Sequence, residues 1–184
     1  MLTRAGRKLQ QDQVRALIPG ILAIIILLGA GITRPLLTWL RNLFGAEAIS
    51  FLVGGAFLLG AIFLIKFIHP WRLAPGRRVA LTAVAAAGLT YAFLFPAWPE
   101  ERIHVLEYAI LGWSARFLVR DAASSRLEAL GVPLLFGFLI GGCDELLQFY
   151  LPERVGDLRD VAFNLAGTTW GIALNAICRG PRRR

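Results

Sequence analysis

The sequence has too few polar residues to cover the surface of a soluble domain of its size. Only 17% of its 184 residues are Asp, Glu, Lys or Arg, whereas 57% are hydrophobic. A polytopic membrane protein fits this composition, because its lipid-facing surface is apolar. Spans of about 20 residues leave room for about five or six helices. We therefore expect an all-α, polytopic membrane bundle with little mass outside the bilayer.

Cysteine and histidine are scarce, with two of each in the chain. Cys143 and Cys178 do not have the spacing of a metal site or a disulfide, so we interpret both as packing residues. His104 is the one histidine among the polar motifs described below, which argues against a zinc or di-iron site. Neither Ser nor Cys stands beside it, so a covalent nucleophile is unsupported.

The sequence also lacks an internal repeat, a low-complexity tract and a soluble-domain boundary. No small-x-small cleavage site follows the first apolar run, so we expect this run to be a retained anchor rather than a signal peptide. A short segment at 33–48, which suits the membrane interface, separates the first two spans. The six predicted spans are 16–32, 49–68, 79–98, 99–118, 127–150 and 157–177.

The basic residues are distributed unevenly across this topology. Fifteen of the 20 Lys and Arg lie at the termini or in the two loops that share their face, whereas nine of the 12 Asp and Glu lie on the opposite half. The positive-inside rule then places both termini in the cytoplasm. Because the basic residues stand at the edges of apolar runs, we expect contact with anionic lipid head groups and no nucleic-acid partner.

Polar side chains nevertheless occur inside three of the predicted spans. They are His104, Glu107 and Tyr108 on the fourth, Asp144 and Gln148 on the fifth, and Asp157, Asp160 and Asn164 on the sixth. Their three- and four-residue spacing puts them on one face of each helix. At 1.5 Å per residue, four of them, His104, Glu107, Asp144 and Asn164, reach a shared depth on the order of 10 Å from the outer face. Since ionisable groups in a membrane are costly, the sequence predicts an outward-facing polar pocket.

Three arginines are expected around the mouth of this pocket, where they suit a phosphate or carboxylate: Arg102, Arg154 and Arg159. Several acidic residues nearby also have ordinary explanations. Asp157 and Asp160 stand where a helix begins, and acidic residues there cap free N–H groups. We interpret Glu100, Glu101 and Glu153 as solvated first-turn and loop charges.

The central residues have two interpretations each. His104 could form a hydrogen bond across helices, or act as a general base whose orientation Glu107 fixes. Asp144 is either the second carboxylate of the pocket or part of a solvated helix end. Glu145 is either structural or part of the pocket.

The segments ERIHVLEYAILG, GGCDELLQFYLPERVGDLRDVAFNLAG and TTWG resemble the VanZ-like family of bacterial membrane proteins. The family pattern has a His and Glu-Tyr on one helix, Asp-Glu and Gln closing another, a Pro-x-Arg loop, and Asp and Asn opening the last helix. The matching positions are His104, Glu107, Tyr108, Asp144, Glu145, Gln148, Pro152, Arg154, Asp160 and Asn164. The resemblance covers residues 99–171. It divides the chain into a three-span region without a recognised motif (1–98), a VanZ-like core (99–178) and a basic cytoplasmic tail (179–184).

The resemblance implies a cell-envelope role in the bacterial inner (cytoplasmic) membrane, because the family's namesake is linked to low-level resistance to the lipoglycopeptide teicoplanin. We expect binding or turnover of a phosphate-bearing lipid head group or a lipid-linked envelope precursor. The candidate catalytic residues are His104, Glu107, Asp144 and Asp160, and the candidate substrate-binding residues are Tyr108, Gln148, Arg154 and Asn164.

The chemistry of this site stays open at the level of sequence. Carboxylates with one His could hold a divalent cation such as Mg²⁺, Mn²⁺ or Ca²⁺ against a phosphate. A metal-free site would use His104 and Glu107 for proton transfer. The non-enzymatic alternative is a lipid- or antibiotic-binding subunit, or one that assembles with another membrane protein.

Overall fold

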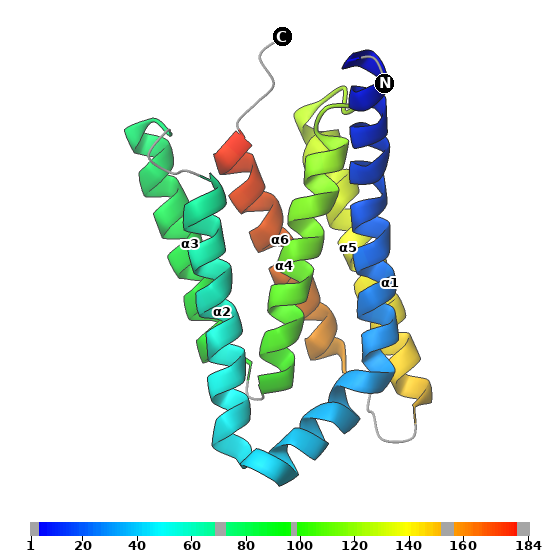
Figure 1. Ribbon diagram of the computed structural model, residues 1–184, viewed down its shortest axis with the longest axis vertical. Coiled ribbons are helices and arrows are strands. Elements are labelled where there is room, and N and C mark those ends of the chain that lie inside the picture. Colours follow the sequence, from blue (N-terminus) through cyan, green and yellow to red (C-terminus); the bar gives the residue numbers. More distant parts are fainter. Residues whose placement is uncertain (1–3, 69–72, 97–98, 152–156, 180–184) are drawn as a thin grey trace.

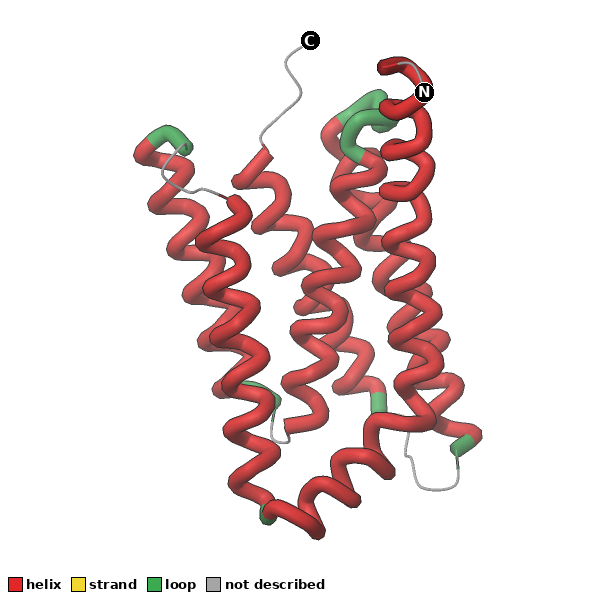
Figure 2. Tube along the Cα trace, in the orientation of Figure 1, coloured by secondary structure: helices red, strands yellow, loops and turns green. Residues whose placement is uncertain are grey.

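Six α-helices make up the regular structure of the residues that the computed structural model describes, which are 4–68, 73–96, 99–151 and 157–179. They are α1 (Arg4–Phe44), α2 (Ala46–Ile68), α3 (Pro75–Leu94), α4 (Pro99–Val119), α5 (Arg126–Tyr150) and α6 (Leu158–Arg179). Figure 1 shows the helices standing side by side in one bundle, and Figure 2 shows no strand in the described residues. The start of α1 and the end of α6 lie at the same end of the bundle, called here the termini end. The predicted all-α class is confirmed.

The first helix differs from the predicted span followed by a separate interfacial segment. α1 is a continuous helix of 41 residues with Pro19 and Pro35 inside it. Because Pro35 cannot donate to the helical ladder and Thr33 Oγ1 bonds back to the Gly29 carbonyl at 2.8 Å, the helix bends in this region. Beyond the bend it runs sideways across the end of the bundle opposite the termini end (Figure 1). Gly45, with a φ of 84°, then allows the chain to turn into α2.

The outside of the bundle is apolar, and charged and polar side chains are buried inside it among hydrophobic ones, which is unlike a soluble protein. Phe51 and Leu127 are 79% and 81% exposed, whereas Asp144 is fully buried. In the described residues, three helical segments are long and apolar enough to cross a membrane, or four if the bent pair Pro35–Phe44 and Glu47–Gly60 is one span. The three are Ala16–Thr33, α5 and α6. The fold is therefore that of a multi-pass membrane protein.

Glycines bring α4 and α6 into backbone contact. A Cβ atom at Gly167 would lie 2.5 Å from the carbonyl oxygen of Val105, and one at Gly171 would overlap the carbonyl oxygen of Ala109. On α4, a Cβ atom at Gly112 would overlap the Thr168 carbonyl oxygen. Small residues allow such close approach of helices in a membrane. This crossing sets the polar residues of α4 beside those of α6.

The fifth helix begins at a capping box. The Ser125 hydroxyl accepts a hydrogen bond from the Glu128 N–H at 3.1 Å, and the Glu128 carboxylate accepts one from the Ser124 N–H at 2.8 Å. From this start, the buried face of α5 carries Gly141, Asp144 and Gln148 toward the opposite end. Cys143 is exposed on α5, so its interpretation as a packing residue is wrong.

Candidate functional site

A histidine between two carboxylates forms the centre of the site. Nδ1 of His104 lies 3.6 Å from Oδ2 of Asp144 and 3.8 Å from Oε2 of Glu107. His104 is almost fully buried and Asp144 completely so, while the Glu107 side chain is 35% exposed. Helices α4 and α5 thus bring together three of the four predicted catalytic residues. Because the Glu107 side chain is partly exposed, it links this buried group to the surface of the bundle. The catalytic roles of His104, Glu107 and Asp144 stay predictions.

The sixth helix contributes a buried amide with no partner. Asn164 is 1% exposed, and neither its oxygen nor its nitrogen has a hydrogen-bond partner in the described residues. Gly141 gives it room, since a Cβ atom there would lie only 3.1 Å from the Asn164 Cβ atom, and the Tyr108 ring is 3.5 Å from the same position. An unsatisfied buried polar group costs about 1–3 kcal/mol. A ligand that binds this amide would recover that cost.

Tyr108 stands between the polar site and the first helix. It is fully buried and packs with Ala23 and Ile26 of α1 and with Leu111 of α4. The predicted pocket uses three helices only, so the contribution of α1 is a feature that the sequence did not indicate. The apolar pattern of α1 predicts a helix, but it does not predict which neighbouring helix α1 packs against.

The end of α5 is tied to the start of α6 by Glu145. Its carboxylate accepts hydrogen bonds from the Gln148 side chain at 3.3 Å and from the Asp157 N–H at 3.1 Å. Oδ1 of Asp157 accepts one from the Arg159 N–H at 2.8 Å, which confirms the predicted helix-capping role of Asp157. Of the two interpretations of Glu145, the structure supports the structural one. Gln148 lies within this group as well as beside Asp144 on the buried face of α5.

Asp160 occupies the first turn of α6, and its N–H donates to the Asp157 carbonyl at 2.9 Å. It is half-buried and stands one turn before Asn164 on the same helix. Its position fits an acidic residue at the positive end of a helix dipole. The catalytic role of Asp160 stays a prediction.

Two of the three arginines expected around the mouth are engaged elsewhere. Nη2 of Arg159 lies 3.2 Å from Glu101, and its Nε lies 3.2 Å from Asp157. The guanidinium of Arg102 lies 5.4 Å from the centre of the Phe93 ring on α3. Arg154 lies outside the described residues, as do Pro152 and Glu153.

Glu101 is 8% exposed, so its interpretation as a solvated first-turn charge is wrong. The sequence does not reveal which carboxylate in the first turn of a helix meets a partner on another helix.

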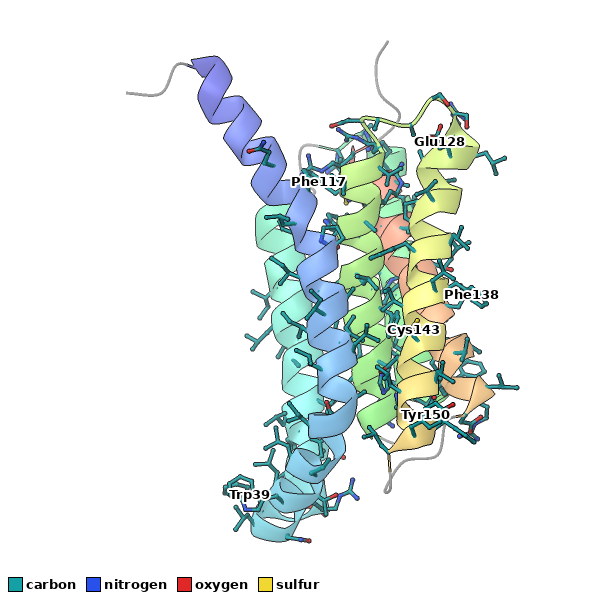
Figure 3. The ribbon with its side chains drawn as sticks, turned by 90° about the vertical axis from the view of Figure 1, so that its right-hand side faces the viewer. Trp39, Phe117, Glu128, Phe138, Cys143 and Tyr150 are labelled. Atoms are coloured by element: carbon teal, nitrogen blue, oxygen red, sulfur yellow. The ribbon has the colours of Figure 1, made fainter. Side chains whose placement is uncertain are left out.

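No group of three or more His, Cys, Asp or Glu in the described ranges is arranged to hold a metal ion. A groove of about 320 Å³ is lined by apolar side chains of α5 and α6, among them Phe138, which Figure 3 shows on the outer side of α5. This groove differs in chemistry from the predicted polar pocket.

A second polar contact, which the sequence analysis missed, joins α4 and α6 near the termini end. Nη1 of Arg116 donates to the Asn175 side-chain oxygen at 2.7 Å. A signal was available, because Asn164, Thr168, Gly171 and Asn175 continue one three-and-four stripe along α6. Arg116 was interpreted only as part of the basic residues that set the topology.

An apolar exterior around a buried histidine–carboxylate group defines a multi-pass helical membrane protein with a polar site between its helices. The profile of the VanZ/LLP1 family matches residues 26–179, which is most of the chain. The protein belongs to the VanZ/LLP1 family, so the resemblance of its motifs is confirmed. The match also extends upstream of residues 99–171 to include α2, α3 and much of α1. The chain matches no curated protein and no solved structure.

Proposed function

We propose that the protein acts on a phosphate-bearing lipid head group or a lipid-linked envelope precursor. The observation that carries this proposal is His104 held between Asp144 and Glu107 inside a membrane bundle, at 3.6 and 3.8 Å. Ionisable residues in such a position are costly and mark functional sites. A soluble substrate would not need a site within the membrane, whereas a lipid carries its head group to the membrane surface.

In this proposal His104 accepts a proton from the substrate. Asp144 and Glu107 both face its Nδ1, so they hold the orientation of the ring. The amide of Asn164 donates to or accepts from the head group, and Tyr108 and Gln148 shape the site around it. Arg154 meets the phosphate, because a guanidinium matches its oxygen atoms.

The proposed topology has six spans, both termini in the cytoplasm of a bacterium, and the site near the outer face of the inner membrane. The concentration of Lys and Arg at the termini end supports this orientation. Figure 3 shows Trp39 and Tyr150 together at the opposite end, where they are 57% and 75% exposed. Exposed Trp and Tyr are typical of the membrane–water interface.

A non-catalytic role in lipid or antibiotic binding, or in the assembly of a membrane complex, is the alternative. It is favoured by the burial of Asp144, Gln148 and Asn164, none of which is more than 1% exposed. Polar groups enclosed in this way can hold helices in register without any reaction.

Mass spectrometry of envelope lipids tests the proposal in bacterial strains that differ only in this protein. One strain lacks it, one expresses it, and one expresses Asp144→Asn at a matched level and thermal stability. A fourth expresses Glu47→Gln, which changes an exposed carboxylate in the first turn of α2 by the same chemistry. A lipid species that requires the protein, is absent with Asp144→Asn and persists with Glu47→Gln is the expected result.

Identical lipid profiles in the intact protein and a well-folded Asp144→Asn variant would contradict catalysis. Retained binding of a head group or antibiotic by that variant would then support the binding role. Loss of folding in Asp144→Asn, with the fold restored by Asp144→Glu but no lipid change in any strain, would support a structural lock.

A further inference from the structure

A buried arginine near the termini end of the bundle forms no ion pair with any described residue. Arg116 stands in the last turn of α4 and is 6% exposed. Its Nη1 is held by Asn175, whose own nitrogen donates to the Trp113 carbonyl at 3.1 Å. Its Nε is buried and has no hydrogen-bond partner in the part of the chain that the structure describes.

The charges around Arg116 are positive. Among the described residues none of the ion pairs involves it. Arg120 follows one turn later on the same face of α4, and its charge acts on Arg116. On α6, Arg179 lies four residues beyond Asn175, and its guanidinium stacks 4.2 Å from the centre of the Phe117 ring. Figure 3 shows Phe117 near the end of the bundle that also carries Glu128.

The surroundings balance this charge only in part. Arg120 pairs with Asp121 at 2.8 Å, so that carboxylate is already engaged. The carbonyl ends of α4 and α6 carry only a fraction of a negative charge. A buried cation is stable when it is paired with an anion and hydrogen-bonded. Within the described part of the chain, this arrangement therefore lacks an anion paired with Arg116.

We propose that Arg116 binds a phosphate group, presented by an anionic phospholipid of the adjoining leaflet or free in solution. A guanidinium contacts phosphate oxygens through two adjacent N–H groups. Asn175 occupies Nη1 and orients the plane, and the Nε N–H is the donor of Arg116 that has no partner among the described residues. Exposed Arg179 and the partly exposed Arg120 supply further donors at the surface. Basic pockets between membrane helices bind anionic head groups in this way.

This site is separate from the His104 site and does not depend on the proposed function. Arg116 and His104 are twelve residues apart on α4, which places them about 18 Å apart along the helix axis. Failure of one proposal therefore leaves the other intact.

Thermal unfolding of the purified full chain in lipid nanodiscs tests the inference. Nanodiscs of phosphatidylcholine alone are compared with nanodiscs that contain phosphatidylglycerol, and with phosphatidylcholine nanodiscs in inorganic phosphate. The variants are Arg116→Gln and, as a matched control, Arg126→Gln, which removes the same charge from an exposed residue at the same end. Arg116→Lys retains the charge but loses the two-pronged geometry.

We expect phosphatidylglycerol or phosphate to raise the unfolding temperature of the unmodified protein and of Arg126→Gln equally, with little rise for Arg116→Gln. The apparent affinity should fall about ten- to hundredfold in that variant. In phosphatidylcholine alone, Arg116→Gln should be at least as stable as the unmodified protein, because it no longer buries an unpaired charge. A response to phosphatidylglycerol only identifies a lipid, and a response to both identifies the phosphate group as sufficient.

Any of the following results would overturn the inference. Equal loss of the response in Arg116→Gln and Arg126→Gln would show general attraction between a basic face and an anionic surface. An unaltered response in Arg116→Gln, or no response in the unmodified protein, would show that Arg116 only ties α4 to α6. If Arg116→Gln does not fold, Arg116→Lys decides the question, since a full response in that variant excludes recognition by the guanidinium.

Discussion

Replacement of Gly171 by alanine should separate the two most closely packed helices. A Cβ atom at this position would overlap the Ala109 carbonyl oxygen and lie 2.7 Å from its carbon and 2.8 Å from the Trp113 nitrogen. Carbon atoms at rest pack about 3.5–4.0 Å apart. The neighbours are backbone atoms, which cannot rotate away. The helices must therefore move apart by about 1 Å to reach that separation.

Overpacking of this kind costs about 1–3 kcal/mol. Alanine also favours the helix over glycine by about 1 kcal/mol, which offsets part of the loss. Gly142→Ala on α5 is the matched control, because a Cβ atom there meets nothing within 4 Å. The helix preference is common to both variants, so their difference isolates the contact between α4 and α6.

The assay is thermal unfolding of both variants in the same detergent. With about 2–4 °C per kcal/mol for a chain of this size, a cost of about 1–3 kcal/mol means that Gly171→Ala should unfold roughly 2–12 °C below Gly142→Ala. Equal unfolding temperatures would refute the close approach of the two backbones. They would also remove the basis for placing Asn164 beside Tyr108.

The remaining predictions concern a helix cap, an ion pair and the unpaired amide. Ser125→Ala should lower the unfolding free energy by about 1 kcal/mol, and no change in an unfolding curve would argue against the cap. A double-mutant cycle of Glu101→Gln and Arg159→Gln should give a coupling below about 1 kcal/mol, because Arg159 is 64% exposed; a larger value would indicate a shielded pair. Asn164→Ala should lower the unfolding free energy by less than Leu111→Ala, for which we expect about 2–5 kcal/mol, because the amide has no hydrogen-bond partner in the described ranges; equal losses of unfolding free energy would indicate a partner.

The helix boundaries could be predicted well because the chain marks them locally. The predicted span 127–150 corresponds to Arg126–Tyr150, and the span 157–177 corresponds to Leu158–Arg179. Ser125 and Asp157 supply the N-caps, which are short-range signals. The third span was less exact, since α3 begins at Pro75 rather than at 79. Its start is fixed by a proline in the first turn, which the apolar pattern does not include.

The clustering of His104, Glu107 and Asp144 could also be predicted from their positions in the sequence. His104 and Glu107 share a face by their three-residue interval, and the equal depth of Asp144 brings it to them. Cross-helix partners of charged side chains could not be predicted in this way. Glu101 meets Arg159 because of the rotation of α4 relative to α6, and that rotation is set by the glycine contacts along the whole crossing.

The α4–α6 pair combines the two kinds of contact that can hold helices together in lipid. Burial of apolar surface does not drive helices together there, so close packing and polar contacts take its place. Gly167 and Gly171 supply the packing in the middle, and the Arg116–Asn175 hydrogen bond supplies a polar contact toward one end. Toward the other end, Asn164 has the buried position of a polar contact but no hydrogen-bond partner among the described residues. Because the glycine crossing already brings the two helices together, their approach at this end does not depend on a hydrogen bond from that amide.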